Sequence, residues 1–159
     1  MKYAHLIKLT VFSYEHEDSE SILSAFLRLL PFSLEDNKVS LKKTGAMGFN
    51  NKKIEIFEVI LIKNNLINDF LKNMLANLDE NQKNEILQQI ESRLDKNLDF
   101  YLRFDKDSWV NDEKLVLTDS GRCFHLRISI AAFPKKRGIA LNVVKELFKH
   151  RNSTTSMSG

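Results

Sequence analysis

The sequence predicts a two-layer α+β domain in which an antiparallel or mixed sheet carries its helices on one face. Several segments alternate apolar and polar residues with a period of two, which is typical of strands with one buried face. Other segments repeat apolar residues every three or four positions, which is typical of helices that bury one stripe. Short polar links between most strands favour antiparallel pairing. The expected element order is β-α-β-β-α-α-β-β-β-α.

The first predicted strand covers residues 2–13, and His5 begins its apolar face. An acidic run follows, in which Asp18 or Ser19 is placed to cap a helix whose first turn favours negative charge. Pro31 ends this helix, because proline lacks the amide that a helix interior requires.

Two strands joined by a hairpin are expected next, over residues 37–44 and 54–62. The loop between them is rich in glycine, asparagine and lysine. A basic tip of this kind can contact a phosphate backbone, or it can be a mobile loop that its lysines keep soluble. Composition leaves both interpretations open.

Two helices follow, one over residues 65–78 and one from Asp79 or Asn81 to Arg93. Each carries a stripe of leucine, isoleucine, methionine or phenylalanine. We interpret these stripes as core rather than as a cofactor pocket.

Three strands are then expected as a meander, over residues 99–106, over residues 114–118 and from Phe124 onward. The tight turn Asp119-Ser-Gly-Arg would join the second to the third. In the third strand, Phe124, Leu126, Ile128 and Ile130 alternate with polar residues.

A C-terminal helix is expected after Pro134, because proline suits the first turn of a helix. Residues 152–159 lack apolar content and are expected to be disordered. Residues 1–151 are therefore expected to form a single domain.

The composition excludes several classes of protein. Hydrophobic residues make up 43% and charged residues 28% of the chain, as in ordinary soluble domains, and no segment approaches a membrane span. The single cysteine, Cys123, excludes an internal disulfide and favours a reducing, cytoplasmic location. With one cysteine and four scattered histidines, we expect no metal site and no cofactor.

The charges are distributed unevenly along the chain. Residues 1–121 carry 16 lysines and arginines against 20 acids, whereas residues 122–151 carry eight cations against one acid. A second basic island, residues 38–53, contains five lysines and no acid. This asymmetry indicates a polyanionic partner, although for any single lysine a hydrated surface charge is the better explanation.

The two islands supply the candidate contacts to RNA phosphates. These are Lys42, Lys43, Lys52, Lys53, Lys135, Lys136 and Arg137. The last three follow Pro134 at a predicted helix start, where free N–H groups and the helix dipole favour an anion.

A third group of candidates is expected on the outward face of the sheet. Arg103, His125 and Arg127 occupy outward positions of their strands, and Tyr101 does as well. Cations beside an aromatic ring on an open sheet face are a recurrent RNA-binding arrangement. The alternative is that Arg103 pairs with Asp99 or Asp105 on a hydrated sheet face.

No catalytic motif is present, and we expect the protein not to be an enzyme. The pattern Asp105-Lys-Asp is a weak match to a metal-binding acid pair. A nuclease or hydrolase would require Asp105, Asp107 and Asp112 to meet in a cleft.

Three segments together resemble a known family: Gly48-Phe-Asn-Asn-Lys-Lys-Ile, Leu102-Arg-Phe-Asp-Lys and His125-Leu-Arg-Ile-Ser-Ile-Ala-Ala-Phe-Pro-Lys-Lys-Arg. The chain resembles the small archaeal proteins described as RNA-binding proteins or predicted exosome subunits, whose fold is similar to that of the large-subunit ribosomal protein that binds 5S rRNA. The resemblance extends from the first strand to the C-terminal helix. It implies an α+β domain that binds RNA and has no catalytic activity.

The chain departs from that family at two places. Phe49-Asn-Asn-Lys stands in the hairpin where the family usually reads Gly-Asn-Pro, and Asp107-Ser-Trp follows the fourth strand where small residues are usual. These are the hairpin and the strand end that a shared binding surface would use.

RNA is thus the expected partner, and association with proteins of an RNA-processing complex is a further expectation. The alternative is a protein-interaction or homodimerisation module that uses the open sheet face or an edge strand. No membrane contact is expected.

Overall fold

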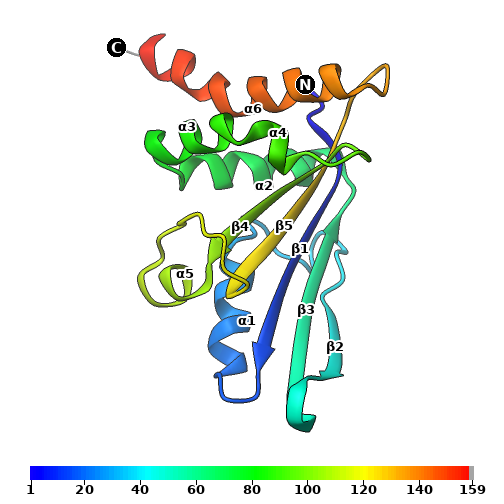
Figure 1. Cartoon of the computed structure of the whole chain (residues 1–159), viewed down its shortest axis with the longest axis vertical. Helices are drawn as coiled ribbons and strands as arrows, with labels where there is room; N and C mark the ends of the chain where they lie inside the picture. The colour runs from blue at the N-terminus through cyan, green and yellow to red at the C-terminus, as the bar shows by residue number, and fades with distance from the viewer. Residues whose placement is uncertain (158–159) are drawn as a thin grey trace.

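A five-stranded antiparallel sheet forms the centre of the computed structural model, which describes residues 1–157 and the side chains of residues 1–149 (Figure 1). The strand order is β2-β3-β1-β5-β4, so the first strand lies in the middle. The strands are β1 Ala4–Tyr14, β2 Lys42–Met47, β3 Lys53–Leu61, β4 Asp99–Asp105 and β5 Cys123–Ile130. Each neighbouring pair is antiparallel, which confirms the expected α+β class.

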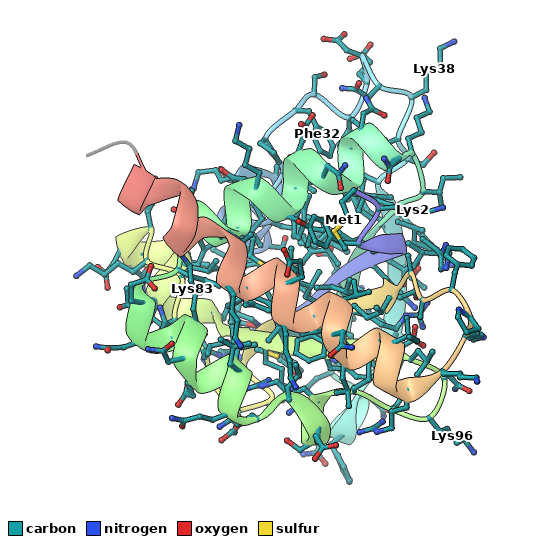
Figure 2. All side chains as sticks on the ribbon, turned by 90° about the horizontal axis from the view of Figure 1, so that it is seen from above. Met1, Lys2, Phe32, Lys38, Lys83 and Lys96 are labelled. Carbon is teal, nitrogen blue, oxygen red and sulfur yellow. The ribbon has the colours of Figure 1, made fainter. Side chains whose placement is uncertain are left out.

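Helices pack on this sheet from one side. They are α1 Ser19–Arg28, α2 Asn64–Ala76, α3 Glu80–Gln88, α4 Ile90–Arg93, α5 Lys106–Asp112 and α6 Arg137–Met157. A 3-10 turn, η1 Phe49–Asn51, lies apart from them at the tip of the β2–β3 hairpin. α2, α3, α4 and α6 gather near one end of the strands, and α1 and α5 lie nearer the other (Figure 1). Seen from above in Figure 2, α6 runs between α2 and α3. In the described part of the chain, every helix is too short or too polar to cross a membrane.

Strand alternation decides which side chains enter the core. Leu9 of β1 and Leu126 of β5 are at most 1% exposed, as is Phe57 of β3. They belong to one cluster with Phe26 of α1 and Phe148 of α6. Burying a side chain of this size contributes about 1.5–3 kcal/mol, so the inward rows hold the helices onto the sheet.

The segment predicted as a strand over residues 114–118 is not a strand, which corrects the expected meander of three. Leu117 makes one isolated bridge to Phe104, and β5 pairs directly with β4. The segment's pairing with β4 is limited to two backbone bonds, from Asp105 N–H to the Val116 carbonyl (2.7 Å) and from Thr118 N–H to the Arg103 carbonyl (3.0 Å). The other edge of the segment is held by Gln82 of α3, whose side chain accepts from Leu117 N–H (2.8 Å) and donates to the Leu115 carbonyl (2.9 Å).

The second strand begins later than predicted. Residues 37 and 38 end a turn and residues 39–41 are irregular, so β2 covers only Lys42–Met47. Lys38 has a left-handed backbone (φ 56°), and the Val39 amide bonds back to the Leu34 carbonyl (2.9 Å). This local turn delays the pairing with β3.

His5 does not begin the buried face of β1, as the alternation predicted. The register of β1 against β5 shifts between Ala4 and Leu6, so Ala4 is buried while His5 is exposed. The His5 ring instead packs edge-on against Phe133, with 5.5 Å between centroids.

Two boundaries near the ends of strands also differ from the prediction. β4 ends at Asp105, whose side chain accepts from Ser108 N–H (3.0 Å) and thereby caps α5, a helix that the sequence analysis missed. α6 begins at Arg137, so Pro134 precedes the helix. The caps at Asp18 and Asp79 are as predicted.

The disordered tail expected at residues 152–159 stays a prediction. α6 enters this segment and extends to Met157, and residues 158–159 lie outside the described residues.

A buried ion pair joins the far end of β1 to α5. Lys106 is 1% exposed, and its Nζ donates to the Phe12 carbonyl (2.6 Å) and to Glu17 Oε1 (3.0 Å). Burial alone would raise the pKa of Glu17, but hydrogen bonds from the Tyr14 amide and Lys106, with the charges of Lys106 and Arg122, lower it. Arg122 also binds Asp107, which ties the segment before β5 into the same network.

Replacing Lys106 with Met is expected to lower the free energy of unfolding by about 3 kcal/mol, because it leaves the Glu17 carboxylate buried with fewer partners. The matched variant Lys114→Met removes an exposed lysine and should change the free energy of unfolding little. Urea unfolding of both variants gives the comparison. Equal stabilities would show that the buried pair has no structural role.

Candidate nucleic-acid interface

The outward side chains of β1, β4 and β5 form the candidate interface. The register places Tyr101, Arg127 and Lys8 in one cross-strand row. Arg103, His125 and Thr10 form the next row. Side chains directly opposite each other lie about 5 Å apart, so these rows make one continuous surface. The structure therefore brings together Arg103, His125 and Arg127, the three sheet residues proposed from sequence.

Arg127 lies in the middle of this surface and makes no hydrogen bond or ion pair within the described residues. Its Nε–H is buried from solvent and has no partner. A guanidinium carries five donors and stays charged, so an unpaired one favours a ligand with acceptor oxygens such as a phosphate. Lys8 beside it is instead paired with Glu58 at 3.2 Å.

Aromatic rings accompany the cations. The Tyr101 ring lies 5.7 Å from the His125 ring, and its hydroxyl donates to Asp95 Oδ2 (3.0 Å), which holds the ring in place. Phe12, lower on β1, faces the same side and is 42% exposed. Aromatic faces on a basic sheet surface can stack with bases.

Arg103 does not pair with Asp99 or Asp105. Within the described side chains, Asp99 accepts from the Ser129 hydroxyl (2.6 Å) and Asp105 caps α5, while Arg103 donates to the Asp119 carbonyl (3.2 Å). Arg103 also lines a polar cavity of about 350 Å³ at the edge of β4, together with Gln89, Ser92, Arg93, Tyr101, Thr118 and Asp119. Its other donors remain free for a ligand.

The hairpin tip and the basic segment 135–137 lie at opposite ends of the sheet. Lys52 and Lys53 are at the tip of the β2–β3 hairpin, and Lys42 and Lys43 are on the edge strand β2. The segment 135–137 follows the opposite end of β5 (Figure 1). The open sheet face lies between them, with Arg127 and Arg103 on it.

Arg137 differs from its two neighbours. Its guanidinium donates to the carbonyls of Glu91 (2.7 Å), Leu94 (3.0 Å) and Asp95 (3.4 Å), so it holds the end of α4. Lys135 and Lys136 are exposed and make no such contact. Of the three, these two lysines are the ones available to a phosphate.

The carboxylates that a nuclease would need do not meet. Asp105 caps α5, and Asp107 is bound by Arg122 (2.7 Å). In the described part of the chain, no group of three or more acids, histidines or cysteines could hold a metal ion. The acid pair around Lys106 is therefore interpreted as structural.

Sequence reasoning missed the contribution of Lys8, and it did not single out Phe49, which is 95% exposed at the hairpin tip. Alternation does place Lys8 outward, but only the strand order shows that β1 lies beside β5. For Phe49 the available signal is an aromatic residue inside a run of lysines, asparagines and glycines.

Comparison with known proteins identifies the family. A family model described as RNA binding matches residues 6–130. The chain belongs to this RNA-binding family. The matched residues contain nearly the whole sheet, including the open-face residues, and end before the basic segment at 135–137.

Relatives in this comparison are archaeal. The chain is 27% identical over 143 residues to RNA-binding protein PAB1135 of Pyrococcus abyssi, covering 90% of this chain and 92% of the relative. Among solved structures, protein AF2318 from Archaeoglobus fulgidus is 27% identical with a TM-score of 0.80, over 91% of this chain and 99% of that one. Protein SSO0741 from Sulfolobus solfataricus is 25% identical with a TM-score of 0.73, over 92% and 98%. These solved structures therefore share this α+β fold.

His125 gives the interface a pH dependence. Burial lowers its pKa below 6.5, and the charges of Arg103, Lys8 and Arg127 lower it further. The folded state thus binds a proton at His125 less readily than the unfolded state does. The contribution of neutral His125 to the free energy of unfolding is fully present above the pKa of the unfolded state, near 6.5. This contribution is lost as the pH falls from there through the lower pKa of the folded state.

We expect His125→Asn to make the unfolding free energy less dependent on pH below about 6.5. An NMR titration of the His125 ring protons should show a midpoint below the ordinary histidine value of 6.5. A midpoint at or above 6.5 would contradict the cationic surroundings of His125.

Proposed function

We propose that the protein binds RNA through the open face of its sheet and does not catalyse a reaction on it. The observation that carries this proposal is Arg127, a guanidinium at the centre of the face whose donors have no partner among the described residues. Membership of the RNA-binding family supports RNA as the polyanion. Because the family model covers the sheet, it also supports the sheet as the binding element.

The chemistry of the face matches single-stranded or irregular RNA. Arg127 and Arg103 neutralise phosphates, while Tyr101 and Phe12 offer rings for stacking. Lys42, with the lysines of the hairpin tip, extends the positive surface toward one end of the sheet. Lys135 and Lys136 extend it toward the other end.

We further propose that this binding serves RNA processing alongside protein partners, in the cytoplasm. The support is the resemblance to archaeal proteins described as predicted exosome subunits, and the single, buried cysteine. A similarity of the fold to the ribosomal protein that binds 5S rRNA is part of the same proposal.

One observation favours the alternative of a protein-interaction module. All six residues of β2 are exposed, and β2 is an edge strand with a free side. The opposite edge, β4, is covered, since Asp105 and Thr118 bond across it to Val116 and Arg103. Lys42 and Lys43 on β2 disfavour pairing with another strand, which makes RNA the better match.

Replacing Arg127 with Gln should weaken RNA binding and lower the slope of log affinity against log salt concentration by about one, because one phosphate contact is lost. The matched control is Lys72→Gln, on α2 in the helical layer, which removes one positive charge far from the open face. Fluorescence anisotropy with a labelled oligoribonucleotide over a range of salt measures both. Equal slopes for the two variants would remove the open face from the proposal.

The basic segment before α6 allows a separation of binding from stability. Lys135→Gln with Lys136→Gln is expected to weaken RNA binding and to leave the melting temperature nearly unchanged. Arg137→Gln should instead destabilise the fold by about 1–2 kcal/mol, because three carbonyls lose a charged donor. Unfolding curves and anisotropy on the same samples distinguish a role in RNA binding from a role in stability. An Arg137→Gln protein that is as stable as the unaltered protein but binds RNA less well would show that Arg137 contacts RNA and does not stabilise the fold.

A further inference from the structure

The tip of the β2–β3 hairpin carries an aromatic ring that the fold does not use. Phe49 is 95% exposed, and Met47 next to the tip is 62% exposed. Pairing of β1 with β3 ends at Ile54, so the tip projects beyond the neighbouring strand (Figure 1). A ring this exposed contributes nothing to the core, although burying a phenylalanine side chain would stabilise the fold by about 1.5–3 kcal/mol.

The loop that holds Phe49 has a defined conformation. The Gly48 amide donates to the Lys52 carbonyl (2.8 Å), and the Lys52 amide donates to the Phe49 carbonyl (3.4 Å). Gly48 passes so close to Ile54 that a Cβ there would lie 2.7 Å from Ile54 Cδ1. Asn50 has φ 60°, a left-handed conformation that asparagine tolerates better than most residues. The ring is thus held outward by its backbone, which reduces the entropy lost when it contacts a ligand.

Two lysines lie beside this ring, because Lys52 and Lys53 follow it in the loop. Lys42 and Lys43 lie at the other end of β2, about 13–17 Å along the strand from Met47. The segment from Lys42 to Ile54 contains no acid, and these four lysines form no ion pair with the described residues. Lys43 lies over the Phe57 ring at 5.8 Å, and all four are exposed. A planar apolar ring among unpaired cations is complementary to a base flanked by phosphates.

We propose that Phe49 stacks on an unpaired base of RNA while the adjacent lysines contact the phosphates beside it. The inference rests on the proposed RNA binding and specifies the ligand as RNA with exposed bases. In a uniform duplex the base faces are covered by their neighbours, so the ring would meet a base only in loops, bulges or single strands. A second copy of this chain is a poorer partner, because two such tips would bring the four lysines at positions 52 and 53 together.

Affinity measurements with a single-stranded oligoribonucleotide test the stacking. Phe49→Ala should lower affinity about five- to a hundredfold, the range seen for loss of base–aromatic stacking. Phe49→Tyr keeps a flat ring and should bind almost as the unaltered protein does. The control Ile62→Ala removes another exposed apolar side chain, 70% exposed beyond the other end of β3, and should leave affinity unchanged.

Fluorescence of Phe49→Trp tests the contact directly. The natural Trp109 is 5% exposed and its Nε1 donates to the Ala25 carbonyl (2.8 Å), so its emission should not respond to a ligand at the hairpin. The indole introduced at the tip should be quenched by the oligoribonucleotide. Inorganic polyphosphate, which has phosphates but no bases, should bind the lysines without quenching it.

The outcomes separate this inference from the proposed function. Salt-dependent RNA binding by the unaltered protein, lost in part by Phe49→Ala and quenching the introduced indole, supports both. RNA binding that persists in Phe49→Ala, with no quenching, overturns the stacking and leaves the sheet-face proposal standing. No RNA binding by the unaltered protein overturns both. If Phe49→Ala converts a dimer to a monomer in light scattering, the tip is a protein contact and the stacking is overturned.

Discussion

One-sided burial of the sheet is the constraint on which the rest of the structure depends. Every second residue of β1, β4 and β5 packs against the helices, and the inward side chains of these strands are almost completely buried. Because the side chains alternate from Ile7 of β1 onward and along β4 and β5, each inward apolar residue places its two neighbours on the opposite face. That face is covered by no helix in the described part of the chain. The residues on that face therefore need not be apolar.

The outward face uses this freedom for charge that the fold does not neutralise. Arg127 makes no hydrogen bond or ion pair among the described residues, although its charge lowers the pKa of Asp95, and Arg103 gives one donor to a carbonyl, whereas other cations are bound within the fold. Lys106 and Arg137 show the contrast, since each is bound to two or more oxygens. A count of charges treats all of these cations alike. Only their contacts show which side chains are available to a ligand and which stabilise the fold.

Much of the fold could be predicted from the sequence, because helix caps and alternation are local signals. Asp18 and Asp79 cap the helices expected of them, and the inward row of β5 is the one that alternation indicates. The failures came from distant partners. Gln82, more than 30 residues away along the chain, binds the backbone of Leu115 and Leu117, and the strand order that places Lys8 beside Arg127 has no local signature. The site could be predicted to the same extent. Alternation in the sequence identifies the outward positions of the strands, but it does not show that Arg137 bonds to the carbonyls at the end of α4.

The central claim is that RNA lies on the open sheet face. NMR of the side chains during titration with a single-stranded oligoribonucleotide tests it most directly, because Arg127 Nε–H and the rings of His125 and Tyr101 give separate signals. The account predicts that these signals shift together and saturate with the binding curve, while amides of α2 in the helical layer stay unchanged. Shifts confined to the helical layer, with Arg127 Nε–H unmoved at saturation, would contradict it.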